Sequence, residues 1–340
     1  MILSGNEAIV EGALKAGAKY FAGYPITPSS EIMHTWAKII PQKNDNSYTF
    51  LQTEDEISAI HSVIGASLAA KKSFTTTSGP GFSLMQEGIG LAYAYKIPLV
   101  LINVQRQGPS TGMPTLFSQG DIMQTQYGTH GDHISITFYP NSIQECFDLT
   151  IQAFNAACES SSPVTILSDA LLAHMYENID TYYQGKISNY PFLGVGNENR
   201  HFTGLTTNKE GNPDTDNPES CKRWIKKIQD SILKTAEKYE LYEYIENKNS
   251  DTLVISFGIL SRVVMEWQDE FAIFRPIRLF PVLEDKLKEI STQYKKIVVV
   301  EANFGQYTKE IERVLRRDIE LVSVQGGKVN VEEIYNQIKK

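Results

Sequence analysis

Short apolar runs alternate with helical segments along most of the chain, and this alternation restricts the fold more than any other feature. Three runs rich in β-branched residues read as buried strands: SFTTTS (73–78), IPLVLINVQ (97–105) and SPVTILSDA (162–170). Between such runs lie segments of helical period. In one of them four apolar residues share a face: Ile57, Ile60, Ile64 and Leu68. We therefore expect an α/β protein with a largely parallel sheet and helices on both faces.

The alternation is interrupted once, in the middle of the chain. Residues 183–222 are rich in Gly, Asn, Pro, Asp and Thr, which favour turns over a packed core. A charged amphipathic helix is predicted from about 222 to 245, and a second alternating series follows. At 340 residues the chain is long enough for two domains. The expected division is an α/β domain at 1–182, a connector with a linking helix at 183–245, and a smaller α/β domain at 246–340.

Charge and hydropathy exclude several classes of function. The net charge is -8, and Lys and Arg are scattered among acidic residues, which argues against a nucleic-acid partner. The sequence shows no signal-peptide pattern and no apolar run of the roughly 18 residues that a membrane helix needs. We expect a cytoplasmic protein with no membrane partner.

Cysteine and histidine patterns give no support for a metal site. Cys146, Cys158 and Cys221 are far apart and form no CxxC pair, so neither a disulfide framework nor an iron–sulfur cluster is predicted. The six histidines form no HExxH motif, and we expect a loop role for the neighbouring His130 and His133. No metal ligand is predicted in this chain.

Polar loops after the predicted strands are the candidate binding loops, because parallel sheets bind ligands beyond the carboxyl ends of their strands. The first is FAGYPITPSSEI (21–32), where Thr27 suits a helix N-cap and Pro28 the first helical position. A helix start just past a strand suits a carboxylate or phosphate. A well-capped helix without a ligand explains the same residues.

Two further loops lie at predicted helix starts. Glu54, Asp55 and Glu56 crowd one of them, which the helix dipole alone explains. In TTTSGPGFSLMQEG (75–88) the glycines Gly79 and Gly81 let the backbone approach a ligand closely. This loop lacks the Lys of a Walker A motif and the GxGxxG spacing, so a nucleotide phosphate is not indicated.

The fourth loop, NVQRQGPSTGMPT (103–115), places Arg106 at the end of a buried strand. A guanidinium there can bind a carboxylate through two parallel hydrogen bonds. An ordinary interface ion pair is the alternative.

Taken together, these loops resemble one family. Seven blocks occur in the family's order: GNEAIVEGALKAG, GYPITPSSEI, LQTEDEISAI, TTTSGPGFSLMQEGIG, NVQRQGPSTGMPT, SQGDIMQ and THGDH. In the second domain FRPIRLFPV and VVVEANFGQ continue the likeness. The chain resembles the alpha subunit of 2-oxoacid:ferredoxin oxidoreductases, most of all the 2-oxoglutarate type.

The resemblance implies a fold and a reaction. The fold is a thiamine diphosphate-binding domain that holds the aminopyrimidine ring, followed by a domain like the C-terminal domain of transketolase. The reaction converts a 2-oxoacid, CoA and oxidised ferredoxin to acyl-CoA, carbon dioxide and reduced ferredoxin. With 2-oxoglutarate the product is succinyl-CoA, a step of the tricarboxylic acid cycle or of its reductive form.

The resemblance also implies roles for individual residues. Glu54 occupies the place of the glutamate that hydrogen-bonds the pyrimidine ring and shares a proton with it, which makes it the catalytic residue. Arg106 matches the substrate-binding arginine, and Thr27 would help to hold the substrate carboxylate. The remaining residues are a wall at the cofactor and two supporting positions: Tyr24, Pro25 and Ile26, then Ser29 and Asp121.

Missing motifs imply partner subunits. The sequence contains no GDG followed by the Asn that binds thiamine diphosphate and magnesium, so a beta subunit is expected to complete the cofactor site. Three scattered cysteines cannot hold the family's iron–sulfur clusters, which places the clusters and Mg²⁺ on partners. Gamma and ferredoxin-like delta subunits are also expected, with ferredoxin as electron acceptor and CoA as substrate.

Three alternatives stay open from the sequence. The chain could be a non-catalytic relative with an assembly role, although such a relative needs none of Thr27, Glu54 and Arg106. It could be a transketolase-like subunit, or a dehydrogenase subunit that feeds lipoamide or NAD. Within the family, branched-chain 2-oxoacids and pyruvate compete with 2-oxoglutarate as substrate.

Overall fold

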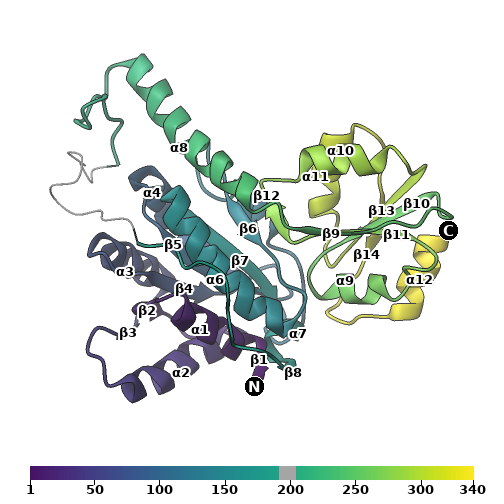
Figure 1. Cartoon of the computed structure of the whole chain (residues 1–340), viewed down its shortest axis with the longest axis horizontal. Helices are drawn as coiled ribbons and strands as arrows, with labels where there is room; N and C mark the ends of the chain where they lie inside the picture. Colours follow the sequence, from purple (N-terminus) through teal and green to yellow (C-terminus); the bar gives the residue numbers. More distant parts are fainter. Residues whose placement is uncertain (191–203) are drawn as a thin grey trace.

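The computed structural model describes residues 1–190 and 204–340, whose strands form two large sheets and one short ribbon (Figure 1). The first sheet has seven strands in the order β12-β6-β7-β5-β4-β2-β3. All neighbours in it are parallel except the pair β12 and β6. In that order the strands are Arg278–Phe280, Ile136–Phe138, Pro163–Asp169, Leu99–Gln105, Ser73–Thr77, Tyr20–Gly23 and Thr49–Gln52.

Helices cover both faces of the first sheet, as the alternating pattern predicts. One face packs against α1 (Gly5–Lys15), α2 (Ser30–Ile39), α6 (Ile143–Ser160) and α8 (Pro218–Lys238). The other face packs against α3 (Glu56–Leu68) and α4 (Pro80–Tyr95). The three central strands β4, β5 and β7 are buried along their whole length, which confirms the strands predicted from their β-branched composition.

The second sheet has five strands in the order β14-β13-β10-β11-β9. These strands are Glu320–Ser323, Lys296–Glu301, Thr252–Ser256, Ala272–Pro276 and Tyr242–Ile245. Helices α9 (Gly258–Met265) and α12 (Val331–Lys339) pack on one face, and α10 (Glu284–Ser291) and α11 (Gln306–Leu315) pack on the other. A smaller α/β unit after the connector is therefore present, as expected.

Short elements complete the chain. The ribbon pairs β1 (Ile2–Ser4) antiparallel with β8 (Tyr176–Asn178). Two short helices follow strands of the first sheet, α5 (Ile122–Tyr127) and α7 (Ala170–His174), and a 3-10 turn covers Ile40–Lys43.

Two strands, β12 and β9, lie where the sequence did not predict them. Strand β12 belongs to the second alternating series but pairs with β6 at the edge of the first sheet. Strand β9 lies in the predicted connector but pairs with β11 of the second sheet. Residues 191–203 of that connector lie outside the described part of the chain. The division at 182 and 245 stays a prediction.

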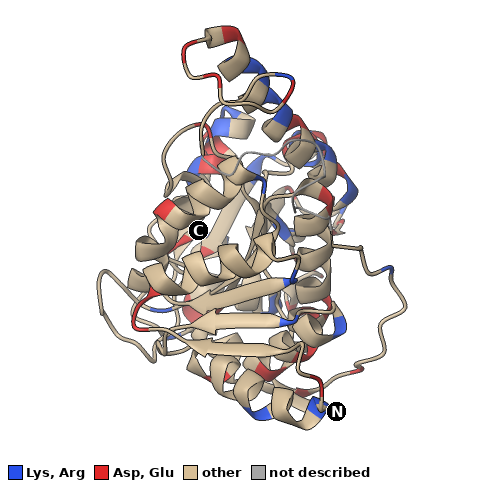
Figure 2. Cartoon of the chain, turned by 90° about the vertical axis from the view of Figure 1, so that its left-hand side faces the viewer, with Lys and Arg blue, Asp and Glu red and all other residues tan. Residues whose placement is uncertain are grey.

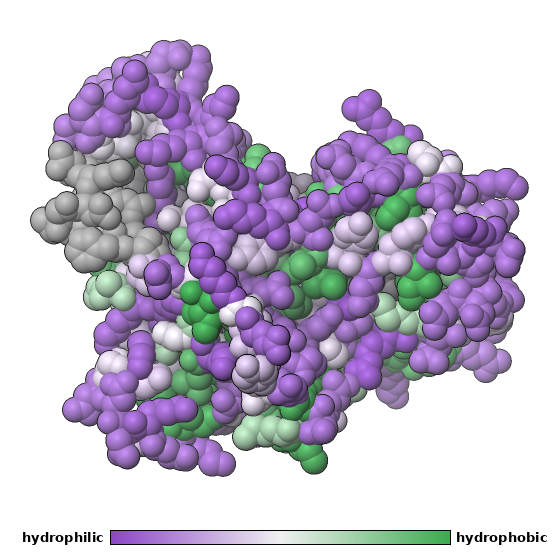
Figure 3. Space-filling model, in the orientation of Figure 1, coloured by the Kyte–Doolittle hydropathy of each residue, from purple (hydrophilic) through white to green (hydrophobic). Residues whose placement is uncertain are grey.

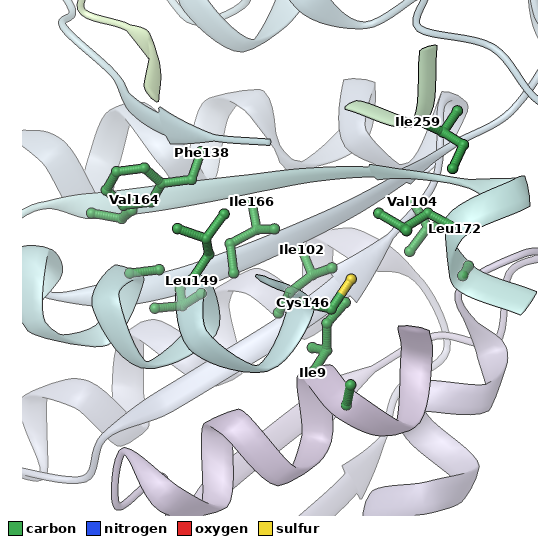
Figure 4. Close-up of a cluster of buried hydrophobic side chains, with 14 of the residues drawn as sticks. Ile9, Ile102, Val104, Phe138, Cys146, Leu149, Val164, Ile166, Leu172 and Ile259 are labelled. Atoms are coloured by element: carbon green, nitrogen blue, oxygen red, sulfur yellow. The ribbon is translucent and has the colours of Figure 1, made fainter. Parts of the chain in front are cut away.

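A shared core holds the two units together. Ile9 of α1, Cys146 and Leu149 of α6 and strand residues of β5 and β7 meet in one cluster (Figure 4). Ile259 of α9 belongs to the same cluster, so a helix of the second unit packs on the core of the first. Arg275 of β11 adds a buried ion pair with Glu145 of α6.

Helix termini test the local predictions. The capping box is confirmed, since the Glu7 N–H donates to Ser4 Oγ at 3.2 Å and the Ser4 N–H donates to Glu7 Oε2 at 2.8 Å. Gly17 follows that helix with a φ of +86°, which favours glycine. The linking helix α8 begins at Pro218, ahead of the predicted position, because Asn217 caps it through the N–H groups of Glu219 and Ser220.

The surface agrees with the charge pattern of the sequence. Acidic and basic residues are interspersed along the chain in the view of Figure 2, and the face drawn in Figure 3 is mostly hydrophilic with separate apolar patches. Within residues 1–190 and 204–340, no helix combines the length and the apolar character that crossing a membrane requires.

Candidate active site

A tight turn separates β2 from α2. The N–H and the hydroxyl of Ser29 both donate to the Ile26 carbonyl, each at 2.9 Å, and Asn6 Nδ2 donates to the Pro28 carbonyl at 2.9 Å. Because this turn occupies residues 26–29, α2 begins only at Ser30, with Ser29 in the N-cap position. The prediction of Thr27 as N-cap is therefore wrong.

The turn places the Thr27 backbone beside Arg106, in the loop of residues 103–115. The Thr27 carbonyl accepts a hydrogen bond from Arg106 Nη1 at 2.9 Å, and its side chain is exposed. Tyr24 is also exposed, and Pro25 and Ile26 are half-buried. The prolines and Ser29 thus build a rigid turn whose backbone holds Arg106, while its outward side chains remain open to a ligand or another chain.

Arg106 is a buried cation with unused hydrogen-bonding capacity. It follows the last residue of β5 and is only 7% exposed. Nη1 bonds Thr27, but Nε is buried without a partner. Burial lowers the pKa of the guanidinium, and the nearby carboxylates of Asp121 and Glu56 oppose that change. A buried arginine with a free N–H group is suited to an anionic ligand.

The three adjacent acids differ sharply in their environments. Thr53 is buried and its N–H donates to the Gly23 carbonyl, whereas Glu54, in the bend that follows β3, is exposed. Asp55 caps α3 by accepting from the Ser58 N–H at 2.7 Å. Glu56 opens the helix and is only 4% exposed. Burial raises the pKa of the Glu56 carboxyl, the Asp55 charge adds to the rise and Arg106 opposes it.

The helical phase explains why Glu56 points inward. The buried face of α3 contains Glu56, Ala59, Ile60, Val63 and Ile64. Ile57 is 46% exposed, so the face predicted from Ile57, Ile60, Ile64 and Leu68 is wrong at its first residue. Glu56 precedes Ala59, Ile60 and Val63 by three, four and seven residues, the spacing of a single helical face. That spacing is the signal in the sequence that could have identified Glu56.

The glycine loop lies directly against Glu56. A Cβ added to Gly81 would lie 2.2 Å from Glu56 Oε1 and 2.2 Å from Thr77 Oγ1, so only glycine fits. The hydroxyls of Thr77 and Ser78 are buried and have no hydrogen-bond partner. These two residues, like Glu56, were not predicted as site residues. Unpaired hydroxyls beside a buried carboxyl form a polar cradle at the end of β4.

Asp121 is the last of the predicted site residues that lies near Arg106. Its carboxylate accepts from Asn103 Nδ2 at 2.9 Å, and the Gly79 N–H lies near it. Burial raises the pKa of Asp121, and the Asn103 and Gly79 hydrogen bonds and the Arg106 charge oppose the rise. The structure therefore brings together Arg106, the Thr27 backbone, Asp121 and Glu56. Glu54 stays a prediction, and its side chain lies on the surface of the isolated chain.

Comparison with known proteins identifies the family. The family model described as the thiamine diphosphate-binding domain of pyruvate flavodoxin/ferredoxin oxidoreductases matches residues 11–239, more than half of the chain. The chain belongs to the 2-oxoacid:ferredoxin oxidoreductase family. A relative named 2-oxoglutarate synthase subunit KorA, from Methanocaldococcus jannaschii, is 39% identical over 96% of this chain and 96% of its own length. A ketoisovalerate oxidoreductase subunit VorB from Methanothermobacter thermautotrophicus is 32% identical over 100% and 96%.

Solved structures agree with this assignment. The 2-oxoglutarate:ferredoxin oxidoreductase from Magnetococcus marinus, solved with 2-oxoglutarate, CoA and succinyl-CoA bound, matches all of this chain with a TM-score of 0.90 and 29% identity. This chain spans 64% of the length of that chain. A split-gene transketolase matches at 12% identity with a TM-score of 0.59, which supports the fold alone. Family membership thus confirms the α/β thiamine diphosphate-binding fold.

The residues present fit the aminopyrimidine half of thiamine diphosphate. The cradle of Glu56, Thr77 and Ser78 offers a buried carboxyl and two unpaired hydroxyls, which suit the polar edge of an aminopyrimidine ring. The diphosphate and magnesium motif is absent from the sequence. Within the described ranges, no group of three or more His, Cys, Asp or Glu side chains is arranged to hold a metal ion.

Proposed function

We propose that this chain is the alpha subunit of an enzyme that converts 2-oxoglutarate, CoA and two oxidised ferredoxins to succinyl-CoA, carbon dioxide and two reduced ferredoxins. Arg106 carries the proposal, because it is a buried guanidinium with an unpaired Nε–H at the carboxyl ends of the strands. The KorA relatives at 39% identity support 2-oxoglutarate as the substrate.

Arg106 would bind the carboxylate that the reaction removes. Its charge orients the 2-oxo carbon and neutralises the carboxylate in a site with little water. The exposed Thr27 side chain lies on the turn that holds Arg106 and supplies a hydroxyl for the same group. Tyr24, Pro25 and Ile26 would form the adjacent wall of the cofactor site, and Ser29 and Asp121 would support the turn and the arginine.

We assign the activating carboxyl to Glu56, with Glu54 as the alternative. When bound, thiamine diphosphate supplies the carbon nucleophile for the 2-oxo group and accepts the electron pair released by decarboxylation. Glu56 would share a proton with the ring nitrogen of the aminopyrimidine. Its burial raises the pKa, so that it can hold the proton more readily than an exposed carboxyl. Thr77 and Ser78 would donate or accept hydrogen bonds at the same ring.

The relatives are named as subunits, and this chain works with partner subunits. We propose a beta subunit that completes the diphosphate and Mg²⁺ half of the cofactor site, together with gamma and ferredoxin-like delta subunits. The beta and ferredoxin-like subunits would hold the iron–sulfur clusters. Ferredoxin is the proposed electron acceptor. A cytoplasmic location stays a prediction.

A branched-chain 2-oxoacid is the second candidate substrate, because the VorB relatives at 32% identity also cover the whole chain. The test is to purify the complex with its partners and to compare 2-oxoglutarate, 2-oxoisovalerate and pyruvate in CoA-dependent viologen reduction. We expect the highest kcat/KM for 2-oxoglutarate. A higher value for 2-oxoisovalerate would support the second candidate, and NAD reduction without dye reduction would overturn both.

A further inference from the structure

Asp121 is held in place by buried groups of the first sheet. Its N–H donates to Gln105 Oε1 at 2.9 Å, and its Oδ2 accepts from Asn103 Nδ2 at 2.9 Å. Gln105 and Asn103 are fully buried residues of β5, the strand that also delivers Arg106. Strand β5, which Arg106 follows, therefore fixes the position of the Asp121 carboxylate.

The same carboxylate lies close to the glycine loop that borders Arg106. The Gly79 N–H lies near this carboxylate, and Gly79 has a φ of +38° and precedes α4. A Cβ added to Gly79 would lie 3.9 Å from Arg106 Nε, so this backbone lies beside the unpaired N–H group. Burial lowers the pKa of Arg106, and the carboxylates of Asp121 and Glu56 oppose this change and so stabilise the charged guanidinium.

The second sheet reaches Asp121 through its neighbours. Gln306 Nε2 donates to the Gly120 carbonyl, and Gln306 Oε1 accepts the Met123 N–H at 2.9 Å. Gln119 makes three hydrogen bonds of 2.7–3.0 Å with Ala302 and Asn303, and its Nε2 donates a fourth to the Phe257 carbonyl at 3.0 Å. Segment 119–123 is thus attached to the second unit on both sides of Asp121.

The loop that makes these contacts is itself bonded to a buried carboxylate. Glu301 is fully buried at the end of β13, and its carboxylate accepts from Asn303 Nδ2, the Tyr307 and Thr308 N–H groups and Thr308 Oγ1, at 2.7–2.9 Å. Both ends of the loop 302–306 are therefore held by a buried carboxylate, and its hydrogen bonds fix segment 119–123.

We propose that Asp121 is a positioning residue for Arg106, and that loop 302–306 of the second sheet sets the place of Asp121. The second unit thereby controls how tightly the first unit binds the 2-oxoacid carboxylate. Asp121 acts by bonding Asn103 and Gln105 at the end of the strand that Arg106 follows and by balancing the guanidinium charge, without touching the substrate. This inference rests on the proposed role of Arg106.

The test uses the assembled complex and measures KM for 2-oxoglutarate, KM for CoA and kcat. Asp121→Asn keeps the shape but loses the charge, and we expect KM for 2-oxoglutarate to rise about 10- to 100-fold, as for the loss of a hydrogen bond to a charged group. KM for CoA should stay within about twofold. Asp121→Glu keeps the charge and should restore part of the affinity, which a purely structural role does not predict.

Gln306→Ala tests the contribution of the second sheet. It removes the bonds to Gly120 and Met123, and we expect a smaller rise in KM that is not additive with that of Asp121→Asn. Tyr127→Phe is the control, because it removes another hydrogen bond between the units, to Glu310, without touching segment 119–123. Its KM should not change.

The outcomes separate this inference from the proposed function. If Arg106→Ala leaves KM for 2-oxoglutarate unchanged, the proposed function of Arg106 fails. If Arg106→Ala raises KM while Asp121→Asn and Gln306→Ala do not, Arg106 keeps its role and the positioning inference is overturned. If Asp121→Asn does not assemble, Gln306→Ala and Asp121→Glu decide the question, with the melting temperature of each complex as the check of folding.

Discussion

Replacing Glu56 by Gln tests the proposed chemistry most directly. The amide keeps the size of the side chain and can still hydrogen-bond, but it cannot carry the proton that a carboxyl shares with the pyrimidine ring. Glu56 is 4% exposed and its pKa is raised by burial, so an uncharged replacement removes a buried charge and should not lower the melting temperature near neutral pH.

The two environments predict how much kcat should fall when Glu56 or Glu54 is replaced. Loss of general acid–base catalysis at Glu56 should reduce kcat by about 100- to 10,000-fold, or about 3–5 kcal/mol of barrier. Glu54→Gln removes the same charge two residues away, on the exposed side. An exposed charge at a helix start is worth about 0.3–1 kcal/mol, so the effect on kcat should be less than about fivefold.

Two assays on the assembled complex separate these outcomes. Viologen reduction with 2-oxoglutarate and CoA measures kcat, and hydrogen exchange at the thiazolium carbon, followed by NMR, measures the step before the substrate enters. We expect Glu56→Gln to slow both and Glu54→Gln to slow neither. Near-normal turnover and exchange in Glu56→Gln, with loss in Glu54→Gln, would refute the assignment based on burial and restore Glu54 to the role.

Four further predictions concern the same site and the folded state. Arg106→Ala should weaken use of 2-oxoglutarate by tens- to several hundred-fold, or about 2–4 kcal/mol, and unchanged KM and kcat would contradict its role. Gly81→Ala should displace Glu56 and lower kcat, whereas Gly65→Ala, whose added Cβ meets nothing within 4 Å, should leave kcat unchanged and stabilise α3 slightly. Burial lowers the pKa of His133 from 6.5 to about 4, so the wild type should lose stability relative to His133→Phe as the pH falls from 6.5 to about 4, and equal melting curves would exclude this. The isolated chain should bind thiamine diphosphate poorly in calorimetry, while the complex binds it well; tight magnesium-dependent binding by this chain alone would contradict a shared site.

Local sequence patterns predicted the elements that depend on near neighbours. The β-branched runs of β4, β5 and β7 read as buried strands because every residue in a central parallel strand packs against helices on one face or the other. The capping box of Ser4 and Glu7 was predictable because both hydrogen bonds close within one turn. The place of Arg106 at the end of a buried strand was also predictable, and its role as a carboxylate ligand stays a proposal.

Predictions failed where the answer depended on contacts distant in sequence. Thr27 looked like an N-cap, but the Ser29 and Asn6 hydrogen bonds use residues 26–29 for a turn. Strand β12 crosses to the first sheet because its partner β6 is available at that edge, which no local pattern records.

The sequence by itself determined the α/β class and the family, because both follow from periodicity and from ordered motifs along the chain. Only the tertiary structure distinguished among the acids at the start of α3: Asp55 caps the helix, which fixes its phase and turns Glu56 toward Gly81 and Arg106. The structure alone also showed that loop 302–306 holds the segment around Asp121. Burial and charge balance are sums over groups brought together by folding, so three adjacent carboxylates that look alike in sequence have different chemistry in the folded protein.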